Sequence, residues 1–123
     1  MIALNRYSKT QNETASPQRL MVLLFEAALR HARTGAQALE AGHRAEAVQS
    51  LTKASDIVAE LDASLDHSRA PQICADLSQL YRFVAQRLTS AACTGNAKAA
   101  REAERAFAPI ADAFAKAVVA SAR

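Results

Sequence analysis

The stretch ETASPQRLMVLLFEAALR, residues 13–30, decides the fold of this chain. Ser16-Pro17 marks a helix start, because a serine oxygen accepts from a free amide of the first turn and proline suits the first helical position. Six consecutive apolar residues, Leu20 to Phe25, follow. At about 100° per residue, such a run places apolar side chains on every side of a helix. The stretch therefore predicts a helix covered by several neighbours.

Length and composition favour one all-α domain. The chain has 123 residues, of which 50% are hydrophobic and only 5% aromatic, and alanine supplies about a quarter. This composition favours closely packed helices. No apolar stretch approaches the roughly 20 residues of a membrane span, and the first six residues lack the charged-then-apolar order of a signal peptide. We therefore expect a cytoplasmic protein without direct membrane insertion.

Four helices are expected, at about 17–41, 43–66, 71–94 and 97–121. Gly42 is the expected left-handed stop of the first, Pro71 opens the third and Asn96 caps the fourth. Pro109 is expected to kink the fourth helix. The predicted core stripe of the third helix is Ile73, Leu77, Leu80, Val84, Leu88 and Ala91. That of the fourth is Ala103, Phe107, Ile110, Phe114 and Ala117.

Amphipathic helices with short connections pack most simply as an antiparallel up-down four-helix bundle, here over residues 16–123. A loosely held N-terminal arm, residues 1–15, precedes it, polar apart from a few residues that include Leu4 and Tyr7. Residues 38–54 also resemble a turn between tetratricopeptide helices. That pattern occurs once, without a copy about 34 residues away, so the bundle is the favoured architecture.

Charges and cysteines exclude several functional classes. The formal net charge is +3, but the basic residues are scattered and often adjoin acids, as in Arg101-Glu102, so a solvated surface is favoured over a nucleic-acid site. Cys74 and Cys93 lie in one predicted helix, about 28 Å apart, and cannot form a bridge within the chain. Two cysteines without paired spacing also argue against a zinc site.

No catalytic constellation is present in the sequence. His31, His43 and His67 lack the spacing that places two imidazoles on one metal ion. Asp62 and Asp66 lie one helical turn apart, but the neighbouring leucines indicate that both face outward. We expect no enzyme, no cofactor and no metal.

The apolar run of the first helix exceeds what one buried face needs. Met21, Val22 and Phe25 are not all expected to fit the bundle face. Either neighbouring helices or the arm residues cover the surplus, or the surplus forms a groove for a partner helix. An arm containing Leu4 and Tyr7 is compatible with both, since it can shield a groove until a ligand displaces it.

Spaced residues along the whole domain carry a family resemblance. Near the start they are Ala15-Ser16-Pro17, Leu20, Leu24-Phe25 and Ala28. Further on they are Lys53-Ala54, Ile57-Val58, Leu61, Leu65-Asp66, Leu77, Leu80-Tyr81, Arg87-Leu88 and Ala91. Over residues 4–117 the chain resembles the flagellar export chaperone family FliS.

The resemblance implies a chaperone that works without ATP. It implies binding of the disordered C-terminal segment of flagellin, which blocks premature polymerisation, and delivery to the export gate protein FlhA. A homodimer is left open. Together, the apolar run and the resemblance give these partner-binding residues: Leu4, Tyr7, Met21, Val22, Phe25, Ile57, Leu61, Leu80 and Tyr81. A nucleic-acid-binding adaptor and a helical homo-oligomer remain as alternatives, separated by salt dependence and by concentration-dependent mass.

Overall fold

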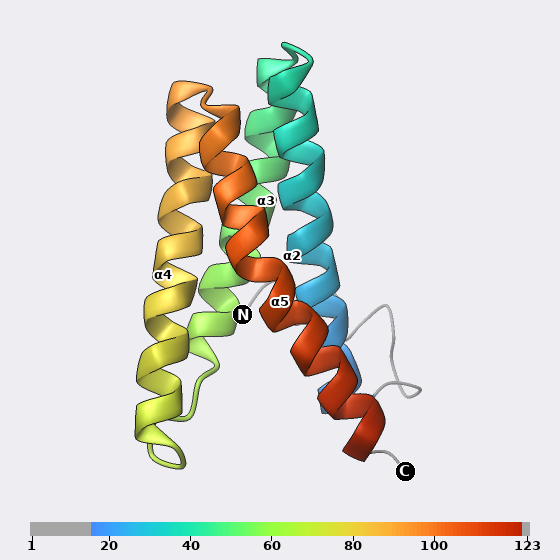
Figure 1. Cartoon of the computed structure of the whole chain (residues 1–123), viewed down its shortest axis with the longest axis vertical. Helices are drawn as coiled ribbons and strands as arrows, with labels where there is room; N and C mark the ends of the chain where they lie inside the picture. Colours follow the sequence, from blue (N-terminus) through green and yellow to red (C-terminus); the bar gives the residue numbers. More distant parts are fainter. Residues whose placement is uncertain (1–15, 122–123) are drawn as a thin grey trace.

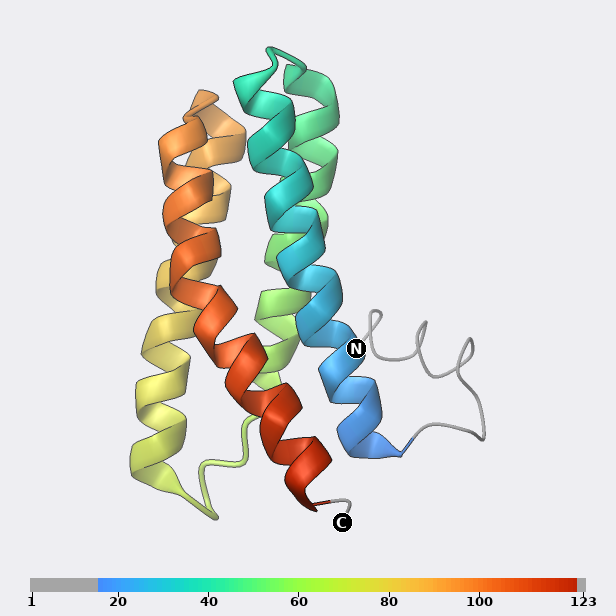
Figure 2. The same cartoon turned by 45° about the vertical axis from the view of Figure 1, so that its right-hand side comes forward.

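A computed structural model describes residues 16–121, and four helices make up most of this range. They are α2 (Pro17–Glu40), α3 (Arg44–Ala63), α4 (Pro71–Thr94) and α5 (Ala97–Ser121). Each packs against the next along the chain, and α5 also packs against α2, which closes a ring (Figures 1 and 2). The predicted all-α antiparallel four-helix bundle is confirmed. The arm expected over residues 1–15 lies outside the described residues.

The helix ends follow from local sequence chemistry. The Ser16 hydroxyl accepts from the amide of Arg19 at 3.1 Å, and the Asn96 side chain accepts from the amide of Ala99 at 3.3 Å. Gly42 and Gly95 stop the preceding helices with φ angles of 81° and 74°. Glycine adopts this left-handed region without the steric cost that a β-carbon would bring.

The helix expected over 43–66 is shorter in the structure, where α3 ends at Ala63. Asp66 lies in the following turn, and its carboxylate accepts from the amide of Ser68 at 3.1 Å. An aspartate that bonds the backbone two residues ahead stabilises a turn instead of a further helical turn. The prediction missed this competition because the apolar spacing continues to Leu65.

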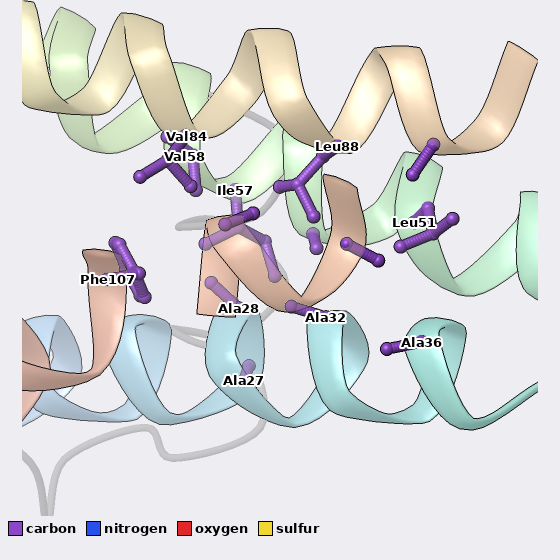
Figure 3. Packing of buried hydrophobic residues seen from close by; sticks show 14 of the residues in the cluster. Ala27, Ala28, Ala32, Ala36, Leu51, Ile57, Val58, Val84, Leu88 and Phe107 are labelled. Atoms are coloured by element: carbon purple, nitrogen blue, oxygen red, sulfur yellow. The ribbon is translucent and has the colours of Figure 1, made fainter. Parts of the chain in front are cut away.

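Small residues dominate one half of the core. Ala28, Ala32 and Ala36 line α2 and face larger side chains from other helices, such as Leu51 and Leu88 (Figure 3). All five are at most 3% exposed. Alanines allow helix axes to approach closely, so this half of the bundle is tightly packed. We call it the closed end; it contains the turns between α2 and α3 and between α4 and α5 (Figure 1).

Polar contacts tie the same end together. The Arg101 guanidinium lies 2.7 Å from Glu40 of α2 and 2.8 Å from Glu104, which also pairs with Arg33 of α2 at 2.8 Å. Arg44, in the first turn of α3, donates to the carbonyl of Cys93 near the end of α4 at 2.6 Å. The α2–α5 and α3–α4 interfaces are therefore both fixed at the closed end.

The opposite end of the bundle is open between α4 and α5. Both views show α5 beside α4 in its first half and moving away from it in its second half (Figures 1 and 2). Pro109 lies inside α5. A proline lacks the amide hydrogen for the carbonyl four residues earlier, and its ring clashes with that carbonyl, which bends a helix. The change of direction of α5 in both views agrees with the bend expected from this proline (Figures 1 and 2). Among the described residues, no helix is long and apolar enough to cross a membrane.

Candidate partner-binding surface

The apolar run of α2 is mostly buried, so of the two alternatives, cover by neighbouring helices describes it better than an open groove. Val22 is 4% exposed and Phe25 is 3% exposed, so the expectation that these residues exceed the bundle face is wrong. Met21 is half-buried against the core. The reason is that α2 packs against α3 on one side and α5 on the other, so its buried arc is wider than one stripe.

Phe25 belongs to an aromatic cluster that fills the open half of the bundle. Its ring centroid lies 5.0 Å from that of Phe114, 5.5 Å from that of Phe107 and 6.4 Å from that of Tyr81. Tyr81 and Phe107 are 6.5 Å apart. These distances fall within the range of favourable aromatic pairs. The core therefore changes from alanine packing at the closed end to aromatic packing at the open end.

Tyr81, also predicted at the partner-binding surface, is 3% exposed. Burial, together with the nearby Asp62 and Cys74, raises the pKa of Tyr81 to about 12. Both effects disfavour the phenolate, because a buried charge loses hydration and a second negative group repels it. Tyr81 thus contributes a neutral, largely apolar side chain to the aromatic cluster.

The other predicted site residues divide into three groups. Ile57 and Leu61 of α3 are 6% and 1% exposed and form part of the core. Leu80 is half-buried at its edge. Leu4 and Tyr7 lie outside the described residues. The predicted residues of α2 and α3 therefore form no open groove in this structure, and the exposed apolar surface lies elsewhere.

Two residues on one face of α4 show where that surface is. Ile73 and Ala91 are eighteen residues, or five helical turns, apart and so point in the same direction. Ala91 is fully buried at the closed end, whereas Ile73 is 63% exposed. The predicted core position of Ile73 is therefore wrong. The face is the same, but α5 moves away from α4 in its second half (Figure 2).

Burial also decreases along the face of α5 that contains Ala99 and Ala117. Ala99 and Ala117 are also eighteen residues apart; Ala99 is fully buried, and Ala117, predicted in the core stripe, is exposed. Ile110 and Phe114, between them, are half-buried. The uncovered faces of α4 and α5 together form the splayed end, which we define by these residues: Ile73, Leu77 and Leu80 of α4, and Ile110, Phe114 and Ala117 of α5.

Phe83 enlarges this apolar surface and was missed by the sequence analysis. It lies on α4, one turn beyond Leu80, and is 46% exposed. Its place just outside the core stripe gave no reason to single it out. Pro109 was the available signal for the splayed end, since a kink can turn the second half of α5 away from a neighbouring helix.

Titratable groups give no chemical centre in the described part of the chain. His31 is half-buried, and burial together with Arg30 and Lys53 lowers its pKa. His43 lies 3.7 Å from Glu46 on the exposed surface. Within residues 16–121, no group of three or more His, Cys, Asp or Glu side chains could hold a metal ion. The chemistry that the site offers is apolar contact.

Two comparisons with known proteins identify the family of this chain. The family described as flagellar protein FliS matches residues 1–121 of this chain. The flagellar secretion chaperone FliS of Salmonella typhimurium is 32% identical over 102 residues, which cover 82% of this chain and 76% of that protein. The matched region contains all four helices and the splayed end. This chain therefore belongs to the FliS family of flagellar secretion chaperones.

Proposed function

We propose that this chain binds the disordered C-terminal segment of flagellin in the cytoplasm, prevents its premature polymerisation and delivers it to the export gate protein FlhA. Membership of the FliS family supports the partner. The observation that carries the binding mode is the exposure of Ile73, 63%, on a face that is otherwise core. An exposed apolar surface on a single domain is typical of an interaction site.

The physical character of the splayed end suits such a ligand. A disordered segment loses chain entropy when it orders, so it needs extended apolar contact to compensate. Ile73 and Phe83 offer exposed apolar area along α4, and Leu77 and Leu80 continue it toward the core. An amphipathic helix that lays its apolar face here would cover side chains that the bundle leaves open.

Calorimetry with flagellin from the same bacterium tests this function. We expect one-to-one binding whose affinity changes little between low and moderate salt, because the contact is mainly apolar. A nucleic-acid adaptor would instead bind nucleic acid with an affinity that falls steeply with salt. A homo-oligomer would show a concentration-dependent mass that flagellin does not alter. Absence of flagellin binding would contradict the proposal.

Two variants test whether flagellin binding depends on the splayed end or on any exposed aliphatic side chain. Ile73→Thr and Val48→Thr each remove an exposed aliphatic group from a helix, at 63% and 38% exposure. Only Ile73 lies at the splayed end. We expect Ile73→Thr to weaken flagellin binding by about 1–2 kcal/mol, with Val48→Thr close to wild type. Equal affinities for the two variants would place the flagellin site elsewhere.

The arm is proposed as part of the same binding apparatus. The double variant Leu4→Ala with Tyr7→Ala is expected to weaken flagellin binding by about 1–3 kcal/mol and leave the melting temperature nearly unchanged. Leu61→Ala should do the reverse. It creates a cavity at a side chain that is 1% exposed, which costs about 2–5 kcal/mol of stability. Unchanged affinity in the arm variant would remove the arm from the site.

A further inference from the structure

The two halves of α5 differ sharply in how they are held. Before Pro109, four residues are at most 1% exposed: Ala99, Ala100, Ala103 and Phe107. In the described part after it, Ile110–Ser121, only Ala111 is buried, with 8% exposure. Proline therefore divides one continuous helix into a packed half and a weakly packed half.

Polar contacts show the same division. The first half is joined to α2 through Arg101 and Glu104, and to α4 through the pair of Glu102 with Arg87 at 3.5 Å. In the described second half, the ion pair and side-chain hydrogen bond lie within α5 itself: Lys116 with Asp112 at 3.1 Å, and Ser121 with the carbonyl of Val118. Between residues 110 and 121, no ion pair or side-chain hydrogen bond holds α5 to α2 or α4 in the part of the chain that the structure describes.

Phe114 is the largest side chain of the second half that packs against the core. Its ring lies 5.0 Å from that of Phe25, in a tilted geometry, and its side chain is half-buried. Phe25 contacts Phe107 and Tyr81 as well, so it keeps two aromatic partners if Phe114 leaves. The ring of Phe114 therefore covers one side of an aromatic cluster that other residues hold in place.

We propose that α5 beyond Pro109 is a hinged flap and that Phe114 is its removable plug. When the flap swings outward, the ring of Phe25, flanked by Tyr81 and Phe107, becomes the floor of a pocket. That pocket accepts one aromatic or branched aliphatic side chain from an amphipathic helix, which replaces Phe114. The identity of the ligand rests on the proposed function, whereas the hinge itself does not.

The hinge has a specific chemical cause. A proline at 109 cannot donate to the carbonyl of Arg105, so the helix loses one backbone hydrogen bond at the point where packing also weakens. Bending here leaves the ion pairs of Arg101 and Glu104 intact. The closed end stays fixed while the open end changes, and residues buried in the free protein reach the ligand only in the opened state.

Amide hydrogen exchange on the free full-length chain tests the hinge. We expect the amides of Ile110–Ser121 to exchange as a block, at least about tenfold faster than those of residues 101–108, which lie beyond the first turn of α5, with a step at Pro109. Pro109→Ala restores the hydrogen bond and should remove the step. Phe114→Ala should accelerate the second half further and leave the first half unchanged. A smooth gradient from Ser121 inward, unaffected by either variant, would indicate end fraying and overturn the hinge.

Fluorine NMR tests the plug. The chain has four phenylalanines, so fluorophenylalanine gives four assignable signals. On adding the C-terminal segment of flagellin, the Phe114 signal should move toward the position of an exposed ring, with Phe107 largely unchanged. Pro109→Ala should weaken this binding several-fold, because it depopulates the opened state. Tight flagellin binding with an unmoved Phe114 signal would overturn the plug and leave the proposed function standing. A step in amide exchange at Pro109 in a chain that does not bind flagellin would support the hinge and contradict the proposed function.

Discussion

A β-carbon on Gly35 would lie 2.5 Å from Cδ2 of Leu51 and 2.6 Å from its Cγ. Gly35 lies in α2 and Leu51 in α3, and Leu51 is only 1% exposed, so its side chain has little room to move. Glycine is therefore required at this position for the close approach of the two helices, although its backbone conformation is helical. The closed end depends on this contact as well as on its alanines.

Gly35→Ala should lower the free energy of unfolding by about 1–2 kcal/mol. Overpacking a tight core costs about 1–3 kcal/mol, and the higher helix propensity of alanine returns part of it. Urea denaturation measures the difference. Thr34→Ala, an exposed neighbour on α2, is the matched control and should be neutral or slightly stabilising. Equal stability of the two variants would show that Leu51 adjusts without cost.

The stability of the closed end should depend on pH through Glu104. Burial favours a higher pKa for Glu104, but hydrogen bonds and charge from Arg101 and Arg33 outweigh it and lower that pKa below the ordinary value of 4.5. A carboxylate with a lowered pKa stabilises the folded protein when the pH is above the ordinary pKa. This contribution disappears as the pH falls through the lowered pKa.

Glu104→Gln should therefore be less stable than wild type at pH 7, by about 1 kcal/mol or less, and equally stable in strong acid. Thermal melts across this pH range give the difference. Asp112→Asn removes an exposed pair within α5 and should show almost no effect at either pH. A stability difference that persists unchanged at low pH would mean that the glutamine disturbs packing instead of removing an ion pair.

The bundle could be predicted from the sequence because its determinants are local. Ser16, Asn96 and the two left-handed glycines act within a few residues of each helix end, and the period of apolar residues identifies each helix. The burial of Val22 and Phe25 could not be predicted in this way. It depends on how many helices surround α2, which is a property of the assembled bundle.

The exposure of residues at the splayed end could not be predicted from the local sequence pattern either. Ile73 and Ala91 occupy equivalent positions in the stripe of α4, and nothing in that stripe distinguishes the exposed residue from the buried one. The difference follows from the course of another helix, because α5, which contains Pro109, moves away from α4 in its second half (Figures 1 and 2). Its kink was predicted, but the residues that it uncovers depend on the alignment of α5 with α4, which the local pattern does not contain.

Tyr81 should destabilise the fold in strong alkali. Because burial raises its pKa to about 12, against an ordinary value of 10.0, the neutral form stabilises the folded protein below pH 10. This contribution is lost as the pH rises from about 10 to about 12. Over that range the free energy of unfolding should fall by about 2 kcal/mol more for wild type than for Tyr81→Phe, as measured by denaturant unfolding. Parallel pH profiles would indicate that the Tyr81 hydroxyl reaches water.

The two cysteines should react as independent thiols with very different rates. Cys93 is exposed, whereas Cys74 is buried and its thiol donates to the carbonyl of Asp66 at 3.4 Å. Both lie on α4, about 28 Å apart along the helix, far beyond the roughly 7 Å that a disulfide can bridge.

An aromatic disulfide reagent should therefore modify one thiol at once and the second only after the structure around the start of α4 opens. Cys93→Ser should abolish the rapid phase and Cys74→Ser the slow one, with denatured protein giving two equivalents as the reference. Reducing agent should change neither the mass nor the melting temperature of freshly purified protein, because no bridge forms within the chain. Rapid modification of both thiols in the native protein would show that the turn carrying Asp66 does not shield Cys74.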